Sequence, residues 1–349
     1  MDHVPTMTAT VIPHALRAAR RAGIDPVPVV ARLHLLSTPT FGDRLPLALI
    51  ADFWEAMMRA LPGDPWFPIR AAAIPEHEEL SLLTMFCRAQ ETLGEALHSV
   101  ARYSLLVTDA FLISVHAGGD RVMLVFDTPP AIERLGVRCQ MEFLVCDTVG
   151  CIEHATGGVR PLEVAFTHSR RVGSGVPPWP AGSALRYDAP RAGIVYARSA
   201  WRAPLSGAKP ELARTLRPQL DTMLSAAEGR MATADRVRMV LAELLRSGSP
   251  SGQRTARRLS MSWRSLQRQL AAAGTTFRAI LDDTRFRFAR EWLGEMPIKA
   301  VADRLGYADQ RAFDRAFRRW AGTSPMHYLH GSTRTRRAQK LGEKARPRR

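Results

Sequence analysis

The sequence predicts two domains, an N-terminal α+β domain in which helices surround a small sheet and a C-terminal domain that is entirely helical. Three observations support this prediction. Apolar residues follow a helical period through most of the first ~100 residues and then change to short β-rich runs. Residues 231–349 contain a two-helix pattern that occurs twice. These residues also carry the whole excess positive charge, because they hold 26 basic and 10 acidic side chains, whereas residues 1–230 hold 23 of each.

The N-terminal elements follow from the spacing of apolar residues. Helices are predicted over residues 13–22, 26–35, 46–60, 79–110 and 132–156. Two β-rich runs, residues 111–115 and 122–126, flank Gly118-Gly119-Asp120, which predicts a β-hairpin. Gly157-Gly158 is expected to end the last of these helices. Further short strands are predicted at residues 162–166, at Tyr187 and at residues 194–196.

Changes in composition set the expected domain boundaries. The α+β domain spans residues 1–207, and a linker region with a helix follows over residues 208–232. The helical domain spans residues 233–331. Residues 332–349 contain eight Lys and Arg against one acidic residue, so we expect a basic disordered tail that adds non-specific affinity for phosphates.

The repeat in the helical domain has the spacing of a helix-turn-helix unit. The run Thr255–Leu259 matches Val301–Leu305 at an offset of 46 residues. A turn follows each run, and a second helix then carries an apolar pair, Leu266 with Leu270 in the first unit and Phe313 with Phe317 in the second. Such a pair forms the buried stripe of a helix, so the opposite face of that helix remains exposed.

Smaller residues in each unit fit the same motif. Ala256 and Ala302 allow the first helix to approach the second closely, and Gly306 supplies the positive φ that a sharp turn requires. Ser262 and Asp309 are expected to be the N-caps of the second helices. The sequence therefore predicts two complete helix-turn-helix units.

The exposed face of each second helix is expected to enter a major groove of duplex DNA. The predicted base-contacting residues are Arg264, Gln267 and Arg268 in the first unit and Gln310, Arg311, Asp314 and Arg315 in the second. Arginine binds a guanine edge through two hydrogen bonds, and glutamine binds an adenine edge in the same way. Ser262, Arg318 and Arg319 are predicted to contact phosphates. The alternative, solvated faces of an ordinary helical bundle, is disfavoured by two such units in one basic region.

Other features of the sequence exclude several protein classes. No apolar run is long enough to span a membrane and residues 1–9 do not resemble a signal peptide, so a cytoplasmic, nucleoid-associated protein is expected. The sequence has no HExxH, GxSxG or P-loop motif, so we expect no enzyme, no catalytic residue, no cofactor and no metal. Cys139, Cys146 and Cys151 leave a redox or metal sensor open, beside the simpler interpretation as small core residues.

Residues 235–329 resemble the DNA-binding domain of AraC/XylS-type regulators. The resemblance rests on residues 302–307, 313–320 and 322–325 with Tyr328, and on residues 277–295, which match the family's long central helix. It implies seven helices, with two helix-turn-helix units held apart by that helix, and its base-contacting positions fall on the seven residues named above. Three positions depart from the family. Ser260 replaces a turn glycine and would adopt a left-handed conformation at a cost of about 1–2 kcal/mol, Thr255 replaces an aliphatic residue, and Leu329 replaces a basic one.

Residues 20–207 resemble the arabinose-binding-like sensor domain of the ornithine-regulator branch of the same family. The matching segments are residues 93–97 with 101–103, the predicted hairpin, residues 164–168, and the run from Leu185 to Leu205. The resemblance implies a transcription regulator that responds to a small-molecule effector, forms a homodimer and acts on RNA polymerase, with an activator favoured over a repressor. Two alternatives are an enzyme tethered to DNA by its helical domain and an architectural DNA-binding protein without an effector.

Overall fold

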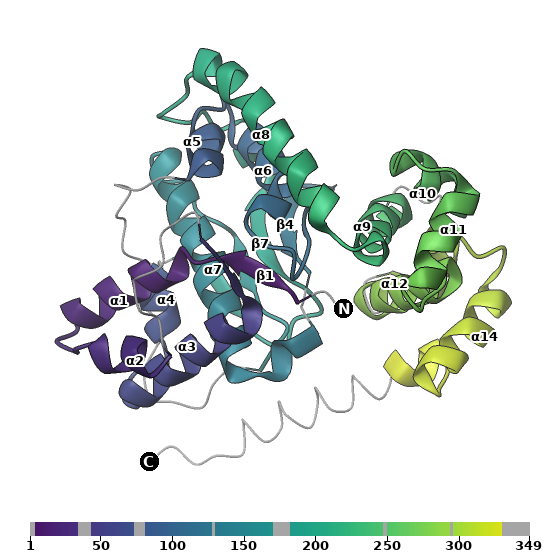
Figure 1. Cartoon of the computed structure of the whole chain (residues 1–349), viewed down its shortest axis with the longest axis horizontal. Coiled ribbons are helices and arrows are strands. Elements are labelled where there is room, and N and C mark those ends of the chain that lie inside the picture. The colour runs from purple at the N-terminus through teal and green to yellow at the C-terminus, as the bar shows by residue number, and fades with distance from the viewer. Residues whose placement is uncertain are drawn as a thin grey trace. The chain divides into compact units, whose positions relative to one another are not determined.

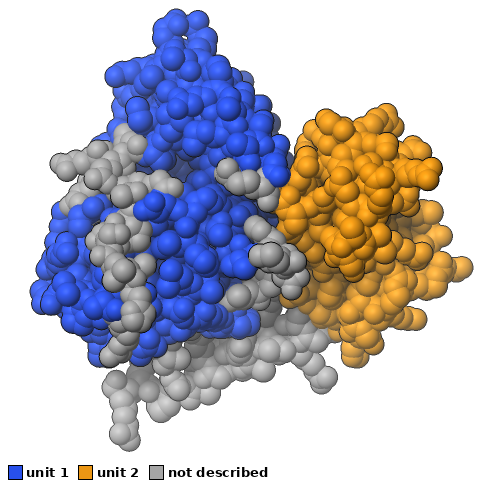
Figure 2. All heavy atoms as spheres, in the orientation of Figure 1, with its two compact units in different colours: residues 1–230 blue, residues 231–349 orange. Residues whose placement is uncertain are grey.

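The computed structural model describes residues 4–33, 43–72, 81–127, 130–169, 182–246, 250–293 and 296–329. The chain forms two compact units, unit 1 over residues 1–230 and unit 2 over residues 231–349 (Figure 2). Unit 1 combines helices with a five-stranded sheet, and the described part of unit 2 contains helices and their connections. The predicted fold classes of both parts are thereby confirmed.

Unit 1 alternates helices with short strands in the first half and places most of its sheet in the second. Its elements are β1 (Thr6–Thr8), α1 (Val11–Arg21), α2 (Val27–Arg32), β2 (Arg44–Pro46), α3 (Leu47–Ala60), α4 (Phe67–Ala72), α5 (Leu82–Arg88), α6 (Leu93–Arg102), β3 (Ile113–Gly118), β4 (Arg121–Phe126), α7 (Leu135–Ala155), β5 (Glu163–Ala165), β6 (Ala184–Arg186), β7 (Ala192–Ala197) and α8 (Pro210–Arg230).

The larger sheet of unit 1 has the strand order β3-β4-β7-β5-β6. All neighbouring strands are antiparallel except β5 and β6. The predicted hairpin is confirmed as β3–β4, in which Gly118 pairs with Arg121 and Gly119 turns the chain at a φ of 57°. A second sheet of two strands, β1 and β2, brings Met7 opposite Leu45. This second sheet was not among the predicted elements.

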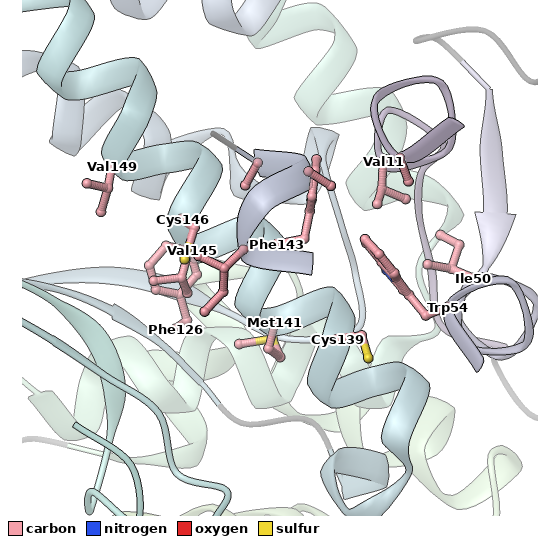
Figure 3. Close-up of a cluster of buried hydrophobic side chains, with 14 of the residues drawn as sticks. Val11, Ile50, Trp54, Phe126, Cys139, Met141, Phe143, Val145, Cys146 and Val149 are labelled. Atoms are coloured by element: carbon pink, nitrogen blue, oxygen red, sulfur yellow. The ribbon is translucent and has the colours of Figure 1, made fainter. Parts of the chain in front are cut away.

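Helix α7 is the centre of the unit 1 core, and α3 and α4 pack along it (Figure 1). Its buried residues include Cys139, Phe143 and Cys146, which lie among apolar side chains of other elements (Figure 3). Trp54 of α3 is fully buried and donates a hydrogen bond of 2.8 Å from Nε1 to Oε1 of Gln140. The predicted glycine end of this helix is also confirmed, because Gly157 and Gly158 have φ values of 68° and 120°.

The prediction of a single helix over residues 79–110 is wrong. The described residues form two helices, α5 and α6, followed by a 3₁₀ turn over Ser104–Leu106. A capping box starts α6: the Thr92 hydroxyl accepts from the backbone N–H of Glu95, and the Glu95 carboxylate accepts from the N–H of Thr92. This arrangement satisfies the free backbone N–H groups at the start of a new helix. The helix is therefore interrupted between α5 and α6, although the apolar period continues.

The segment before α8 is attached to unit 1 by backbone hydrogen bonds. The N–H groups of Leu205, Ser206 and Lys209 donate to carbonyl groups of residues 91, 155 and 89. Helix α8 then runs through Pro218 without interruption and buries Leu220. Residues 204–230, which include most of the predicted linker region, therefore belong to unit 1.

A polar contact also holds α8 to α6. The hydroxyl of Tyr103 donates to Oδ1 of Asp221 at 2.7 Å, and the guanidinium of Arg102 donates to the same oxygen at 3.0 Å. This hydrogen bond from Tyr103 is the largest cause that lowers the pKa of Asp221. Because Tyr103 is buried, the contact fixes α8 at one position along α6.

Unit 2 consists of α9 (Thr233–Arg246), α10 (Gly252–Arg258), α11 (Trp263–Ala272), α12 (Phe277–Trp292), α13 (Ile298–Arg304) and α14 (Gln310–Ala321), and residues 325–329 are again helical. The two predicted helix pairs are α10–α11 and α13–α14, and α12 is the predicted long helix between them. The predicted basic tail lies outside the described residues. Among the helices that the structure describes, none has the length and apolar character needed to cross a membrane.

Candidate nucleic-acid interface

The turns of the two helix pairs have the same backbone geometry. Ser260 has a φ of 54° and Gly306 a φ of 77°. In each turn the following N–H reaches back to the alanine of the first helix, from Met261 to Ala256 at 2.9 Å and from Tyr307 to Ala302 at 3.0 Å. The prediction that a non-glycine residue occupies the left-handed region in the first turn is confirmed. The first pair therefore carries backbone strain that the second avoids.

Both predicted N-caps are confirmed. The hydroxyl of Ser262 accepts a hydrogen bond of 3.1 Å from the N–H of Ser265 at the start of α11. The carboxylate of Asp309 accepts one of 2.7 Å from the N–H of Ala312 at the start of α14. These caps set the first turn of each second helix, where side chains closest to a groove would lie.

The buried stripes of the second helices are also as predicted. Leu266 and Leu270 of α11 are fully buried in a core with residues of α9, α10 and α12. Phe313 and Phe317 of α14 are equally buried. Since these pairs fix which side of each helix faces inward, the orientation of the opposite side follows from packing.

The predicted base-contacting residues lie on these opposite sides. Six of the seven are exposed, namely Arg264, Gln267 and Arg268 on α11 and Gln310, Arg311 and Arg315 on α14. Asp314 is half-buried. Within the described part of the chain no ion pair engages Arg268, Arg311 or Arg315. The structure thus brings the residues of each set together on one helix face, while their contact with bases stays a prediction.

The three predicted phosphate contacts differ in their surroundings. Arg318 is exposed. The Ser262 hydroxyl already serves as the N-cap of α11, although the residue is exposed. Arg319 forms an ion pair of 2.9 Å with Asp282 of α12. Arg319 would have to leave this partner, or share it, in order to bind a phosphate.

Helix α12 fixes the second helix pair through two arginine contacts. Nε of Arg285 donates to the carbonyl of Leu305 at 2.9 Å, and its guanidinium lies 4.5 Å from the ring centroid of Tyr307. At the end of α12, the guanidinium of Arg304 lies 4.8 Å from the centroid of Trp292. Cation–π contacts of this kind add to the packing of the turn against α12.

A groove beside α14 was missed by the sequence analysis. It has a volume of about 580 Å³ and is lined by Met296, Pro297, Ile298, Lys299, Gln310, Met326 and Leu329. The one sign of this groove in the sequence was Lys299, a single basic residue at the start of α13. Met296, Pro297 and Ile298 directly precede Lys299, whereas Gln310, Met326 and Leu329 lie 11 to 30 residues further along, so the fold completes the lining.

Comparison with known proteins identifies the family. The profile described as "Arabinose-binding domain of AraC transcription regulator, N-term" matches residues 15–205, which is more than half of the chain. The chain belongs to the AraC family of transcription regulators. A profile described as "Helix-turn-helix domain" matches residues 255–331 of this AraC-family protein. It is therefore a DNA-binding transcription regulator with an arabinose-binding-like sensor domain, as the resemblances in the sequence implied.

Proteins similar to this AraC-family regulator are themselves transcription regulators. The ornithine utilization regulator of Pseudomonas aeruginosa is 36% identical over 128 residues, which cover 36% of this chain and 37% of that protein. The HTH-type transcriptional regulator VirS of Mycobacterium tuberculosis is 23% identical over 316 residues, 88% of this chain and 92% of VirS. The crystal structure of the transcriptional regulator CdpR from Pseudomonas aeruginosa covers 91% of this chain and 97% of its own, with 20% identity and a TM-score of 0.44.

Two of the four cysteines of this AraC-family regulator are core residues, whereas Cys87 and Cys151 are partly exposed. Cys139 and Cys146 are buried in the hydrophobic core of unit 1. Burial raises the pKa of the Cys87 thiol to about 12, and it raises the pKa values of Cys146 and Cys151 as well. Such thiols are poor nucleophiles at neutral pH. Among the described residues no three His, Cys, Asp or Glu side chains are grouped so that they could hold a metal ion.

Proposed function

We propose that this protein is a sequence-specific transcription activator whose arabinose-binding-like domain binds a small-molecule effector. The observation that carries the DNA-binding part is the pair of exposed arginine- and glutamine-bearing faces, each set by its own N-cap and buried stripe. Charge supports it, because unit 2 holds the whole net charge of +16 while unit 1 is neutral. An α+β domain without net charge supplies no general attraction to phosphates, which favours a sensing role.

In this proposal Arg264, Gln267 and Arg268 bind one segment of major groove, and Gln310, Arg311, Asp314 and Arg315 bind another. Ser262, Arg318 and Arg319 contact phosphates, and residues 332–349 add affinity that does not depend on sequence. The protein acts as a homodimer that contacts RNA polymerase at the nucleoid in the cytoplasm. Effector binding alters the affinity for operator DNA, and by linkage operator DNA alters the affinity for effector by the same factor.

Mapping of DNA fragments bound by the full-length protein in cells, followed by reporter assays on the bound promoters, tests this proposal. An activator gives reporter output that falls when its gene is deleted, whereas a repressor gives output that rises. Across a panel of metabolites, at least one should change the output and also raise the melting temperature of the protein, since ligand binding stabilises by RT ln(1+[L]/Kd). The same output in every metabolite would favour an architectural protein. Metabolite turnover by the purified protein would favour the tethered enzyme.

A further inference from the structure

The groove beside α14 shares one residue with the predicted base-contacting face. Gln310 belongs to both, because it lines the groove and is the first residue of α14. The lining also includes Met326 and Leu329 of the helical segment that follows α14. An object bound against the face of α14 would therefore extend directly into the groove.

The lining combines one positive charge with apolar surface. Lys299 is exposed, and Lys299 and Gln310 are the polar side chains in a lining otherwise made of Met, Pro, Ile and Leu. Met326 is 54% exposed, so its side chain is accessible to a partner. A deoxyribose presents an apolar face of suitable size, and the phosphate next to it requires a cation.

The charge of Lys299 and of the residues that follow Leu329 in the chain favours an anionic partner. The chain leaves the described structure at Leu329, a residue of the groove lining, and then continues into residues that include eight Lys and Arg. A groove that is bordered by Lys299 and followed by this basic stretch is electrostatically complementary to a nucleic acid strand. An acidic protein partner would also match these charges. It would not account for the position of the groove next to the predicted base-contacting face of α14.

We propose that this groove seats the sugar–phosphate backbone of one DNA strand next to the bases contacted by α14, with Lys299 on a phosphate and Met326 and Ile298 against a deoxyribose. The inference rests on the proposed DNA-binding function of the α14 face. It adds a contact that fixes how deeply α14 enters the major groove, and this contact is independent of base sequence.

Binding of the full-length protein to a mixed-sequence duplex, measured by fluorescence anisotropy over a range of salt concentrations, tests the proposal. Lys299→Gln removes the charge and keeps the length of the side chain. We expect its log–log salt dependence to become less steep by about 0.9, the value for one phosphate contact, with a Kd that is higher at low salt. Lys299→Arg should restore the slope. Met326→Glu places a negative charge against the strand and should weaken binding further.

Unit 1 offers matched controls for both substitutions. Lys209→Gln and Met223→Glu change an exposed lysine and a 43% exposed methionine outside unit 2, and neither should alter the salt slope. Thermal melting shows whether each variant is folded. Because Met326 and Lys299 are exposed, we expect both variants to fold. If Lys299→Gln and Met326→Glu bind duplex as the unaltered protein does, the proposal is overturned. If they do so but reporter output falls, the groove serves a protein partner and the proposal is equally overturned. If the unaltered protein shows no salt-dependent binding, the proposed function itself fails.

Discussion

Nε2 of His168 lies 3.1 Å from Oε1 of Glu142 inside unit 1, and the hydroxyl of Tyr187 donates to the same oxygen at 3.3 Å. The side chains of His168 and Glu142 are 1% and 0% exposed. Burial, together with the nearby charge of Arg138, lowers the pKa of His168 to about 4, while Asp188 and Glu133 act in the opposite direction. The imidazole is therefore neutral in the folded protein at physiological pH.

This buried histidine predicts a loss of stability in mild acid. In the unfolded chain His168 has a pKa of about 6.5, so below that pH the unfolded state binds a proton that the folded state excludes until about pH 4. The free energy of unfolding should fall across this window by up to about 3 kcal/mol. Urea unfolding of the protein and of His168→Gln at several pH values checks this. The variant should lose less stability across the window, and His154→Gln, at an exposed site, should behave as the unaltered protein; equal acid losses in all three would contradict the prediction.

Two glycines of α7 should respond in opposite ways to substitution by alanine. A Cβ at Gly136 would lie 2.0 Å from the backbone oxygen of Ala51, where α3 crosses α7, whereas the nearest atom to a Cβ at Gly150 is 3.9 Å away. Gly136→Ala should destabilise unit 1 by about 3 kcal/mol, because backbone must move. Gly150→Ala should be neutral or stabilising by about 0.5–1 kcal/mol through its helix propensity. Thermal unfolding of both variants measures these effects. A lower midpoint for Gly150→Ala than for Gly136→Ala would refute this account.

The two turns of unit 2 allow a reciprocal test of backbone strain. Ser260→Gly should stabilise unit 2 by about 1 kcal/mol, because a side chain at a φ of 54° costs energy that glycine does not. Gly306→Ser should destabilise it by about 1–2 kcal/mol. Its added Cβ would also lie 3.3 Å from Cδ of Pro250. Thermal melting of the full-length variants gives the sign of each stability change. A change of the same sign in both variants would show that the two turns are not equivalent.

Arg315 should contribute to the choice of sequence rather than to general affinity. Arg315→Ala is expected to cost about 1–3 kcal/mol on a preferred site and to relax preference at one or two base pairs. Arg238→Ala provides a control in the same unit, since Arg238 pairs with Asp235 on α9. Competition binding against a randomised duplex library measures both effects. An equal loss on preferred and random DNA would place Arg315 on the phosphates instead.

The sequence was most informative where a single residue type has a single physical use. Ser262, Asp309 and Gly306 act locally, so caps and turns could be assigned before the structure was known. The repeat added a second copy of each signal, and the buried pairs Leu266–Leu270 and Phe313–Phe317 then determined the outward faces.

Other features were not predicted, either because the apolar period concealed a local signal or because they depend on contacts between distant residues. The apolar period runs from α5 into α6 without interruption, and the sign of the break was the Thr92–Glu95 pair, which has the spacing of a capping box. Strands β1 and β2 have three residues each and pair across more than thirty residues of chain. The Arg319–Asp282 ion pair and the groove at Lys299 likewise join distant elements, which is why neither could be predicted from the sequence.

The apolar cluster that holds α8 is separate from the main core of unit 1. It comprises Leu83, Phe86, Ala89, Tyr103, Ala213 and Leu220. A small satellite cluster opens at a lower free energy than a main core does, so the amide protons of α8 should exchange with solvent through sub-global opening, ahead of those of α7. Helix α8 is the last element before the boundary at residue 230. The layer that we expect to open ahead of the main core is thus the one from which the DNA-binding unit continues. A ligand that altered the protection of α8 would act on the chain segment to which that unit is joined.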